Sequence, residues 1–169
     1  MADHVWQVLF ACSDNSARGI MAEALLTHWG RGRFHVVSAG YRPADEIDPI
    51  AKDLLGKLDL ATGALHPKSW DRFAGPDAPA LDFVFVLCES CAEQPMPEFP
   101  GHPMVAHWHL PDPKQAEGSE VERAQAFREA LRSIEARIKP FVALREEALD
   151  RIVMRERLEE IGRRGAIGG

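Results

Sequence analysis

A cysteine and an arginine lie six positions apart near the start of the chain, at the two ends of the sequence CSDNSAR (residues 12–18). A tight turn from a strand into a helix points successive backbone N–H groups inward, and the helix N-terminus adds partial positive charge. Both effects favour an anion and stabilise a thiolate, so we expect Cys12 to be ionised at neutral pH. Arg18 can direct two N–H donors onto a tetrahedral oxyanion such as phosphate or arsenate.

The residues between Cys12 and Arg18 suit such a turn, because Asn15 and Ser16 are able to steady it. Asp14 adds a carboxylate that would repel a dianion if it pointed inward. The structural alternative is that Cys12 is a small buried residue at the end of a strand and that Arg18 is a solvated helix residue. The elements around the loop favour the chemical interpretation.

Strands and helices alternate along the chain. The sequence predicts strands over residues 5–11, 33–39, 83–87 and 104–107, and helices over 17–29, 49–58 and 121–138, with Pro140 disturbing the last helix near its end. This alternation predicts an α/β domain with a parallel sheet covered by helices on both faces and a ligand site beyond the carboxyl ends of the strands. Cys12, Cys88 and the loop after His107 would all lie at that edge.

A further helical stretch begins beyond Arg145, and it contains apolar residues and a Gly-rich end. We therefore expect one domain over residues 1–143 and a C-terminal helical extension over residues 144–169. Such a helix packs either on its own domain or on a second copy, so the extension predicts a possible homodimer.

The composition excludes several classes of protein. With 169 residues the chain fits one domain and needs no disulfides or metal to hold its core. A net charge of -6 argues against nucleic-acid binding. No apolar run reaches the roughly 18 residues that a membrane span requires, and the start of the chain lacks the pattern of a secretory signal. We expect a cytoplasmic protein without a membrane partner.

Three cysteines, Cys12, Cys88 and Cys91, are an odd number for a reducing compartment, which favours reactive thiols over a structural disulfide framework. Cys88 and Cys91 have the C-x-x-C spacing of redox pairs. Zinc binding by these two cysteines with nearby histidines is the alternative, but four ligands at the usual spacing are not obvious, so no metal site is predicted.

The segment VLFACSDNSAR (residues 8–18), followed by MAEALL (residues 21–26), resembles the low-molecular-weight tyrosine phosphatase superfamily, and in particular its arsenate reductase branch. The resemblance continues through SAG at 38–40, FPG at 99–101 and HWHLPDP at 107–113, and it covers roughly residues 5–140. It implies a three-layer fold with a four-stranded parallel sheet flanked by helices, to which this chain adds a C-terminal helix.

The resemblance also implies roles for individual residues. Cys12 would be the nucleophile and Asp112 the general acid, although Asp-Pro is also common turn chemistry. Cys88 would attack the sulfur of the arsenic-bearing Cys12, release arsenite and leave a Cys12–Cys88 disulfide. For Trp108, packing in the core is favoured over a place in the pocket wall. The loop main chain would hold the oxyanion, through Ser13, Asp14, Asn15, Ser16, Ala17 and Arg18.

The chain departs from the family pattern at three positions. Met96 stands where the reductases have a third cysteine, and a thioether cannot open a disulfide. Cys91 would compensate by forming a Cys88–Cys91 disulfide for thioredoxin to reduce; alternatively, glutathione with glutaredoxin would resolve Cys88 directly. Gly19 replaces a serine whose hydroxyl hydrogen-bonds the thiolate, and Asp14 replaces a glycine or neutral residue.

We therefore expect arsenate reduction by Cys12 and Cys88, with cellular thiols as reductant and no tightly bound cofactor. The first alternative is a low-molecular-weight protein tyrosine phosphatase, which needs no second thiol. The second is a non-catalytic oxyanion-binding protein, which the replacements at Asp14 and Gly19 would favour.

Overall fold

Four parallel strands form the centre of the computed structural model, which describes residues 4–168. The strands are β1 (Trp6–Cys12), β2 (Phe34–Gly40), β3 (Phe83–Val86) and β4 (Met104–His107), in the spatial order β2-β1-β3-β4. The register pairs Cys12 with Gly40 and Ala11 with Val86, so the carboxyl ends of β1, β2 and β3 meet at one edge. The predicted three-layer α/β fold with a four-stranded parallel sheet is confirmed.

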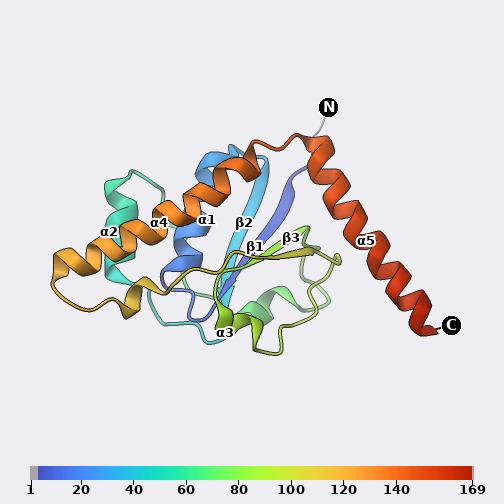
Figure 1. Ribbon diagram of the computed structural model, residues 1–169, viewed down its shortest axis with the longest axis horizontal. Coiled ribbons are helices and arrows are strands. Elements are labelled where there is room, and N and C mark those ends of the chain that lie inside the picture. Colours follow the sequence, from blue (N-terminus) through green and yellow to red (C-terminus); the bar gives the residue numbers. More distant parts are fainter. Residues whose placement is uncertain (1–3, 169) are drawn as a thin grey trace.

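Helices follow the strands as α1 (Arg18–Gly30), α2 (Pro49–Lys57), α3 (Glu89–Ala92), α4 (Glu120–Val142) and α5 (Glu146–Gly168). Two short 3-10 turns, η1 (Trp70–Phe73) and η2 (Pro113–Gln115), complete the fold. Helix α4 packs against α1 and crosses the front of the molecule in Figure 1. At its start, Ser119 and Glu122 form a capping box that satisfies free backbone N–H groups.

The strands β1 and β3 lie at the centre of the core, and almost all of their residues are buried. Phe10, Phe83 and Phe85 are at most 2% exposed. Trp108, just after β4, stacks on Phe85 with ring centroids 3.9 Å apart, so it packs against the core as predicted.

Element boundaries differ from the predicted ones by a few residues. Pro140 lies in the last turn of α4, near the end of the helix as expected, but the predicted end at residue 138 is wrong, since α4 continues to Val142. A proline in the last turn removes one intrahelical hydrogen bond, and the packing of Ile138 and Phe141 in the core opposes that loss. The elements α3, η1 and η2 were not predicted, because a single turn is too short to have a hydrophobic period.

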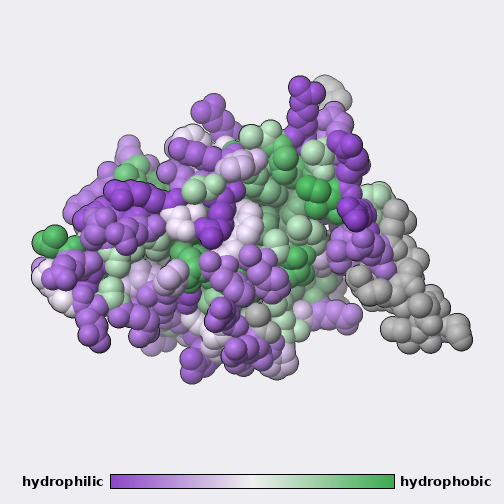
Figure 2. Space-filling view, viewed as in Figure 1, coloured by the Kyte–Doolittle hydropathy of each residue, from purple (hydrophilic) through white to green (hydrophobic). Residues whose placement is uncertain are grey.

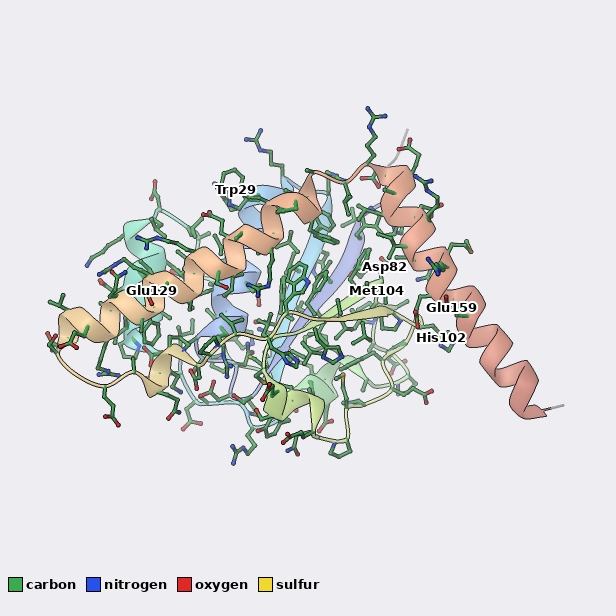
Figure 3. The ribbon with its side chains drawn as sticks, in the orientation of Figure 1. Trp29, Asp82, His102, Met104, Glu129 and Glu159 are labelled. Carbon is green, nitrogen blue, oxygen red and sulfur yellow. A yellow bond between two sulfur atoms is a disulfide. The ribbon has the colours of Figure 1, made fainter. Side chains whose placement is uncertain are left out.

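Helix α5 runs down one side of the molecule, away from α4 (Figure 1). Its inner face buries Leu149 and Val153. Arg157 donates to Asp82 (2.9 Å) and to the carbonyl oxygen of Gly101 (3.0 Å), and Asp82 lies between β3 and α5 in Figure 3. These contacts attach α5 to the domain at the amino end of β3.

The boundary predicted between residues 143 and 144 falls in the short turn between α4 and α5. That residues 144–169 form a separate unit stays a prediction. Figure 2 shows apolar side chains gathered between α4 and α5 on this face of the molecule. Within residues 4–168, no helix is long and apolar enough to cross a membrane.

Candidate functional site

A cavity of about 750 Å³ opens at the carboxyl edge of the sheet. The loop after β1 contributes Ser13, Asp14 and Arg18, the segment after β3 contributes Cys88, and the loop after β4 contributes Asp112. Three segments that are far apart in the sequence therefore meet around one space, as the β-α-β alternation predicts. Cys12 does not line the cavity; it lies behind the loop.

Asn15 holds the loop after β1 in its conformation. Its φ of 56° is left-handed, which asparagine tolerates better than most residues. Its Nδ2 donates to Ser38 Oγ (2.9 Å), and its Oδ1 accepts from the backbone N of Lys68 (2.9 Å). Ser38 Oγ in turn donates to Glu23 (2.7 Å), which lies 3.6 Å from Lys68 Nζ. Asn15 thus stabilises the turn, as predicted, through a network of hydrogen bonds that extends to Glu23 and Lys68.

The Cys12 sulfur is turned towards the protein interior. The side chain is 2% exposed, and its Sγ lies 3.7 Å from the carbonyl oxygen of Ala39, in the position of a thiol donor. Burial raises the pKa of the Cys12 thiol to about 11, although Arg18 and the backbone N–H groups of Gly19 and Asn15 act in the opposite direction. The expectation that Cys12 is ionised at neutral pH is therefore wrong for this state, because desolvation outweighs the local positive charge.

Gly19 explains how the sulfur fits in this position. A Cβ atom at residue 19 would lie 2.7 Å from Cys12 Sγ, closer than real Cβ contacts, and 3.0 Å from Asn15 Nδ2, which is also tight. The sulfur therefore occupies space that a serine at this position would fill. The glycine at position 19, where the family has a serine, therefore leaves the space that the buried Cys12 sulfur occupies.

Arg18 connects the loop after β1 to the loop after β4. Its NH1 donates to the carbonyl oxygen of Leu110 (3.0 Å), and its NH2 lies 3.4 Å from Ser13 Oγ and 3.8 Å from Asp112 Oδ2. Asp112 also caps η2, where its carboxylate accepts from the backbone N of Lys114 (3.0 Å). Asp112 is thus a turn residue that also faces the cavity, and its role as general acid stays a prediction.

Cys88 and Cys91 form a disulfide, with their Cα atoms 5.5 Å apart. Cys88 lines the cavity and its Sγ accepts from Ser90 Oγ (3.4 Å), whereas Cys91 is completely buried. Glu89–Ala92 forms the single turn α3, which brings the two cysteines to adjacent positions. Cys12 is the free cysteine.

Two cations near the cavity were missed by the sequence analysis. Lys114 donates to Asp14, and Arg42 reaches the same cavity from the segment after β2, where its backbone N donates to the carbonyl oxygen of Ser13 (3.0 Å). The unusual Asp14 was the available signal, because a carboxylate in such a loop calls for a nearby cation. His107 Nδ1 lies 3.2 Å from His109 Nε2. Among the described residues, no three His, Cys, Asp or Glu side chains are grouped so that they could hold a metal ion.

The fold and the site define a class: a parallel α/β protein in which an arginine and a carboxylate line a cavity, with a cysteine six residues before the arginine lying behind the cavity wall. The family model described as "Low molecular weight phosphotyrosine protein phosphatase" matches residues 7–154, and the chain belongs to this family. The resemblance seen in the sequence is confirmed.

Several proteins similar to this chain are reductases. The chain is 31% identical over 139 residues to an arsenate reductase of Shouchella clausii, an alignment that covers 79% of this chain and 93% of that relative. It is 26% identical over 137 residues to a glutaredoxin arsenate reductase of Synechocystis, covering 81% of this chain and 96% of the relative. A thioredoxin-dependent arsenate reductase of Corynebacterium glutamicum has a similar structure, with a TM-score of 0.61 and 27% identity; the match spans 83% of this chain and 62% of that one.

Proposed function

We propose that this protein reduces arsenate to arsenite, with Cys12 as the nucleophile and Cys88 and Cys91 as the thiols that follow. The observation that carries the proposal is the Cys88–Cys91 disulfide at the wall of a cavity that also contains Arg18 and Asp112. A phosphate-ester hydrolase needs no redox pair beside its nucleophile. The named activity of the similar proteins points the same way.

The first step joins Cys12 to arsenic. The Cys12 thiolate attacks arsenate, a sulfur–arsenic bond forms, and one arsenic–oxygen bond breaks. Asp112 supplies the proton with which that oxygen leaves as water. Arg18 and the backbone of residues 13–18 hold the remaining oxygens. This step requires Cys12 to turn from its buried position into the cavity and to lose its proton.

The second step reduces arsenic. The Cys88 thiolate attacks Cys12 Sγ, and a Cys12–Cys88 disulfide forms as the sulfur–arsenic bond breaks. The bonding electron pair stays on arsenic, which goes from the +5 to the +3 state and leaves as arsenite. The two sulfurs supply the two electrons.

The third step restores the nucleophile. The Cys91 thiolate attacks Cys88 Sγ, so the disulfide moves to Cys88–Cys91 and Cys12 is released as a thiolate. The disulfide that the structure contains is the product of this step. An external thiol then reduces it, and the names of two similar proteins point to thioredoxin or to glutaredoxin. Cys88 is the sulfur that such a thiol would reach, since it lines the cavity and is 4% exposed, whereas Cys91 is not exposed at all.

The proposal is tested by supplying purified protein with arsenate and either thioredoxin or glutaredoxin, and separately with an aryl phosphate. We expect arsenite formation that is lost in both Cys12→Ser and Cys88→Ser. Phosphate release that needs Cys12 but is insensitive to Cys88→Ser would instead identify a phosphatase. Oxyanion binding without either reaction would identify a non-catalytic binding protein.

We also propose that the protein works in the cytoplasm, where thioredoxin and glutathione keep thiols reduced. The predicted homodimer through α5 stays a prediction. Sedimentation equilibrium measures the number of chains per particle for the whole chain and for a variant truncated after residue 145. The same number for both proteins would exclude a dimer through α5.

A further inference from the structure

Asp14 and Lys114 form an ion pair across the mouth of the cavity. They lie 100 residues apart in the sequence, and Lys114 Nζ also donates to Ser16 Oγ (3.0 Å). The two side chains are about one third exposed, so the pair is partly removed from water. The Asp14 carboxylate, which the sequence analysis expects to repel a dianion if it points inward, therefore has a cation beside it.

The pair joins the two loops that carry the proposed chemistry. Lys114 belongs to η2, whose cap is Asp112, and Asp14 follows Cys12 by two residues. A second link connects the same loops, where Arg18 donates to the carbonyl oxygen of Leu110 (3.0 Å). Through these two links, the segment that contains Asp112 is attached to the loop that follows Cys12.

The pair also sets the charge of the cavity. The acidic side chains that line it are Asp14, Glu89 and Asp112, and the basic ones are Arg18, Arg42 and Lys114. Without Lys114 the carboxylates would outnumber the cations, and the uncompensated Asp14 would lie in the loop that has to accept an anion. Burial alone would raise the pKa of Asp14, but hydrogen bonds from Lys114 and Ser16 outweigh it, and its pKa lies below its ordinary value. Asp14 is thus charged and needs its partner.

We propose that Lys114 is a positioning residue for the oxyanion site: by pairing with Asp14 it neutralises this carboxylate and holds the Asp112 segment over the nucleophile loop. Asp14 and Lys114 then act as a unit, and removing the cation alone should harm the site more than removing both. The inference rests on the proposed function for its reaction, but oxyanion binding can be measured without turnover.

The test is a double-mutant cycle with Lys114→Met, Asp14→Asn and the double variant. Binding of inorganic phosphate is measured by calorimetry, and kcat and KM are measured for arsenite formation. We expect Lys114→Met to weaken phosphate binding about tenfold, and the double variant to return to within about threefold of the parent, since contacting charged groups couple by that order. Lys114→Arg should keep most of the affinity. Lys57→Met, on exposed α2, is the matched control and should change nothing.

Two results would overturn the inference. If Lys114→Met weakens phosphate binding equally in the parent chain and in the Asp14→Asn background, Lys114 acts on the anion alone and the pair has no role. If Lys114→Met leaves both binding and kcat unchanged in a folded protein, as judged by circular dichroism, the pair is a surface contact. Coupling in phosphate binding without arsenite formation by the parent protein would support the pair and reject the proposed function.

Discussion

The two thiol regions at the carboxyl edge of the sheet are both buried, but only one of them borders the cavity. Cys12 is reduced, buried behind its loop and hydrogen-bonded to a backbone carbonyl group. Cys88, the first residue of the disulfide, lines the cavity beside Ser90. The Cys12 sulfur, which would begin the proposed reaction, thus lies away from the cavity, while Cys88, itself only 4% exposed, lies at the cavity wall.

This difference indicates which stage of the proposed cycle the structure describes. When the disulfide is at Cys88–Cys91, a new attack of Cys12 on arsenate cannot be completed until the disulfide is reduced. Its burial and raised pKa keep it as an unreactive thiol, because the thiolate is the nucleophile. The disulfide, in contrast, has Cys88 at the cavity wall, where a thiol that enters the cavity would meet it. Because Cys12 lies away from the cavity, it would be protected from oxidation until the disulfide has been reduced.

The largest effect that separates the two regions should come from Cys91→Ala. With Cys91 absent, the disulfide cannot leave Cys12, so we expect about one arsenite per chain in a first turnover and a fall of about 100-fold or more in the steady state. Quenched-flow measurement with thioredoxin as reductant checks both numbers. An unchanged steady-state rate would mean that an external thiol attacks Cys88 directly.

The next effect concerns the pH dependence of the buried region. In the oxidised protein, Cys12 is the free thiol, and its raised pKa predicts that alkylation by iodoacetamide increases about tenfold per pH unit from pH 7 to 10. Since the folded pKa of about 11 exceeds the ordinary 9.0, the protonated thiol contributes stability that is present below pH 9. That contribution, at most about 2–3 kcal/mol, is lost as the pH rises towards 11.

Urea titrations at several pH values, with Cys12→Ala as the control, measure this linkage. The control should lack the decrease between pH 9 and 11 that the parent chain has. A parent chain that is alkylated equally fast at pH 7 and pH 9 would show that Cys12 is already ionised.

A smaller effect is expected from Gly19→Ala, which would remove the difference between a sulfur behind the loop and a sulfur at the cavity wall. The added Cβ would lie 2.7 Å from Cys12 Sγ, so the sulfur has to move, and we expect it to turn towards the cavity. We expect faster alkylation at pH 7 and a loss of stability of about 1–3 kcal/mol from overpacking. Gly56→Ala, where a Cβ meets no atom within 4 Å, is the control. An unchanged alkylation rate would contradict the role given to Gly19.

The smallest effect should come from Arg157→Ala, at the opposite end of β3. The substitution leaves the Asp82 carboxylate, 7% exposed, without its main cation, and Arg157 itself is about one third exposed. We expect a loss of about 1–2 kcal/mol in the free energy of unfolding and no change in arsenite formation. Thermal unfolding and the steady-state rate check the two parts. A reduced rate at full stability would show that α5 influences the site.

Much of the fold was predictable because its signals are local. The buried strands are continuous apolar runs, and α1, α2 and α4 have helical periodicity. Turns of one helical repeat, such as α3 and η2, lack a period and were missed. The residues of the site were predictable as types and spacing, since Cys12, Arg18, Cys88 and Asp112 each follow a strand or end one.

The orientation and partners of those side chains were not predictable. Whether Cys12 faces the cavity depends on the space beside Gly19, and the Asp14–Lys114 pair joins residues that only the folded chain brings together. Ionisation of Cys12 was mispredicted because the helix N-terminus and Arg18 are visible in the sequence, whereas burial of the sulfur is not.

The most direct test of the central claim is a single turnover of fully reduced protein with arsenate and no external thiol, followed by alkylation and peptide mapping by mass spectrometry. The account predicts one arsenite per chain, a Cys88–Cys91 disulfide and a free Cys12. Arsenite formed while Cys91 stays free, or no arsenite at all, would contradict it.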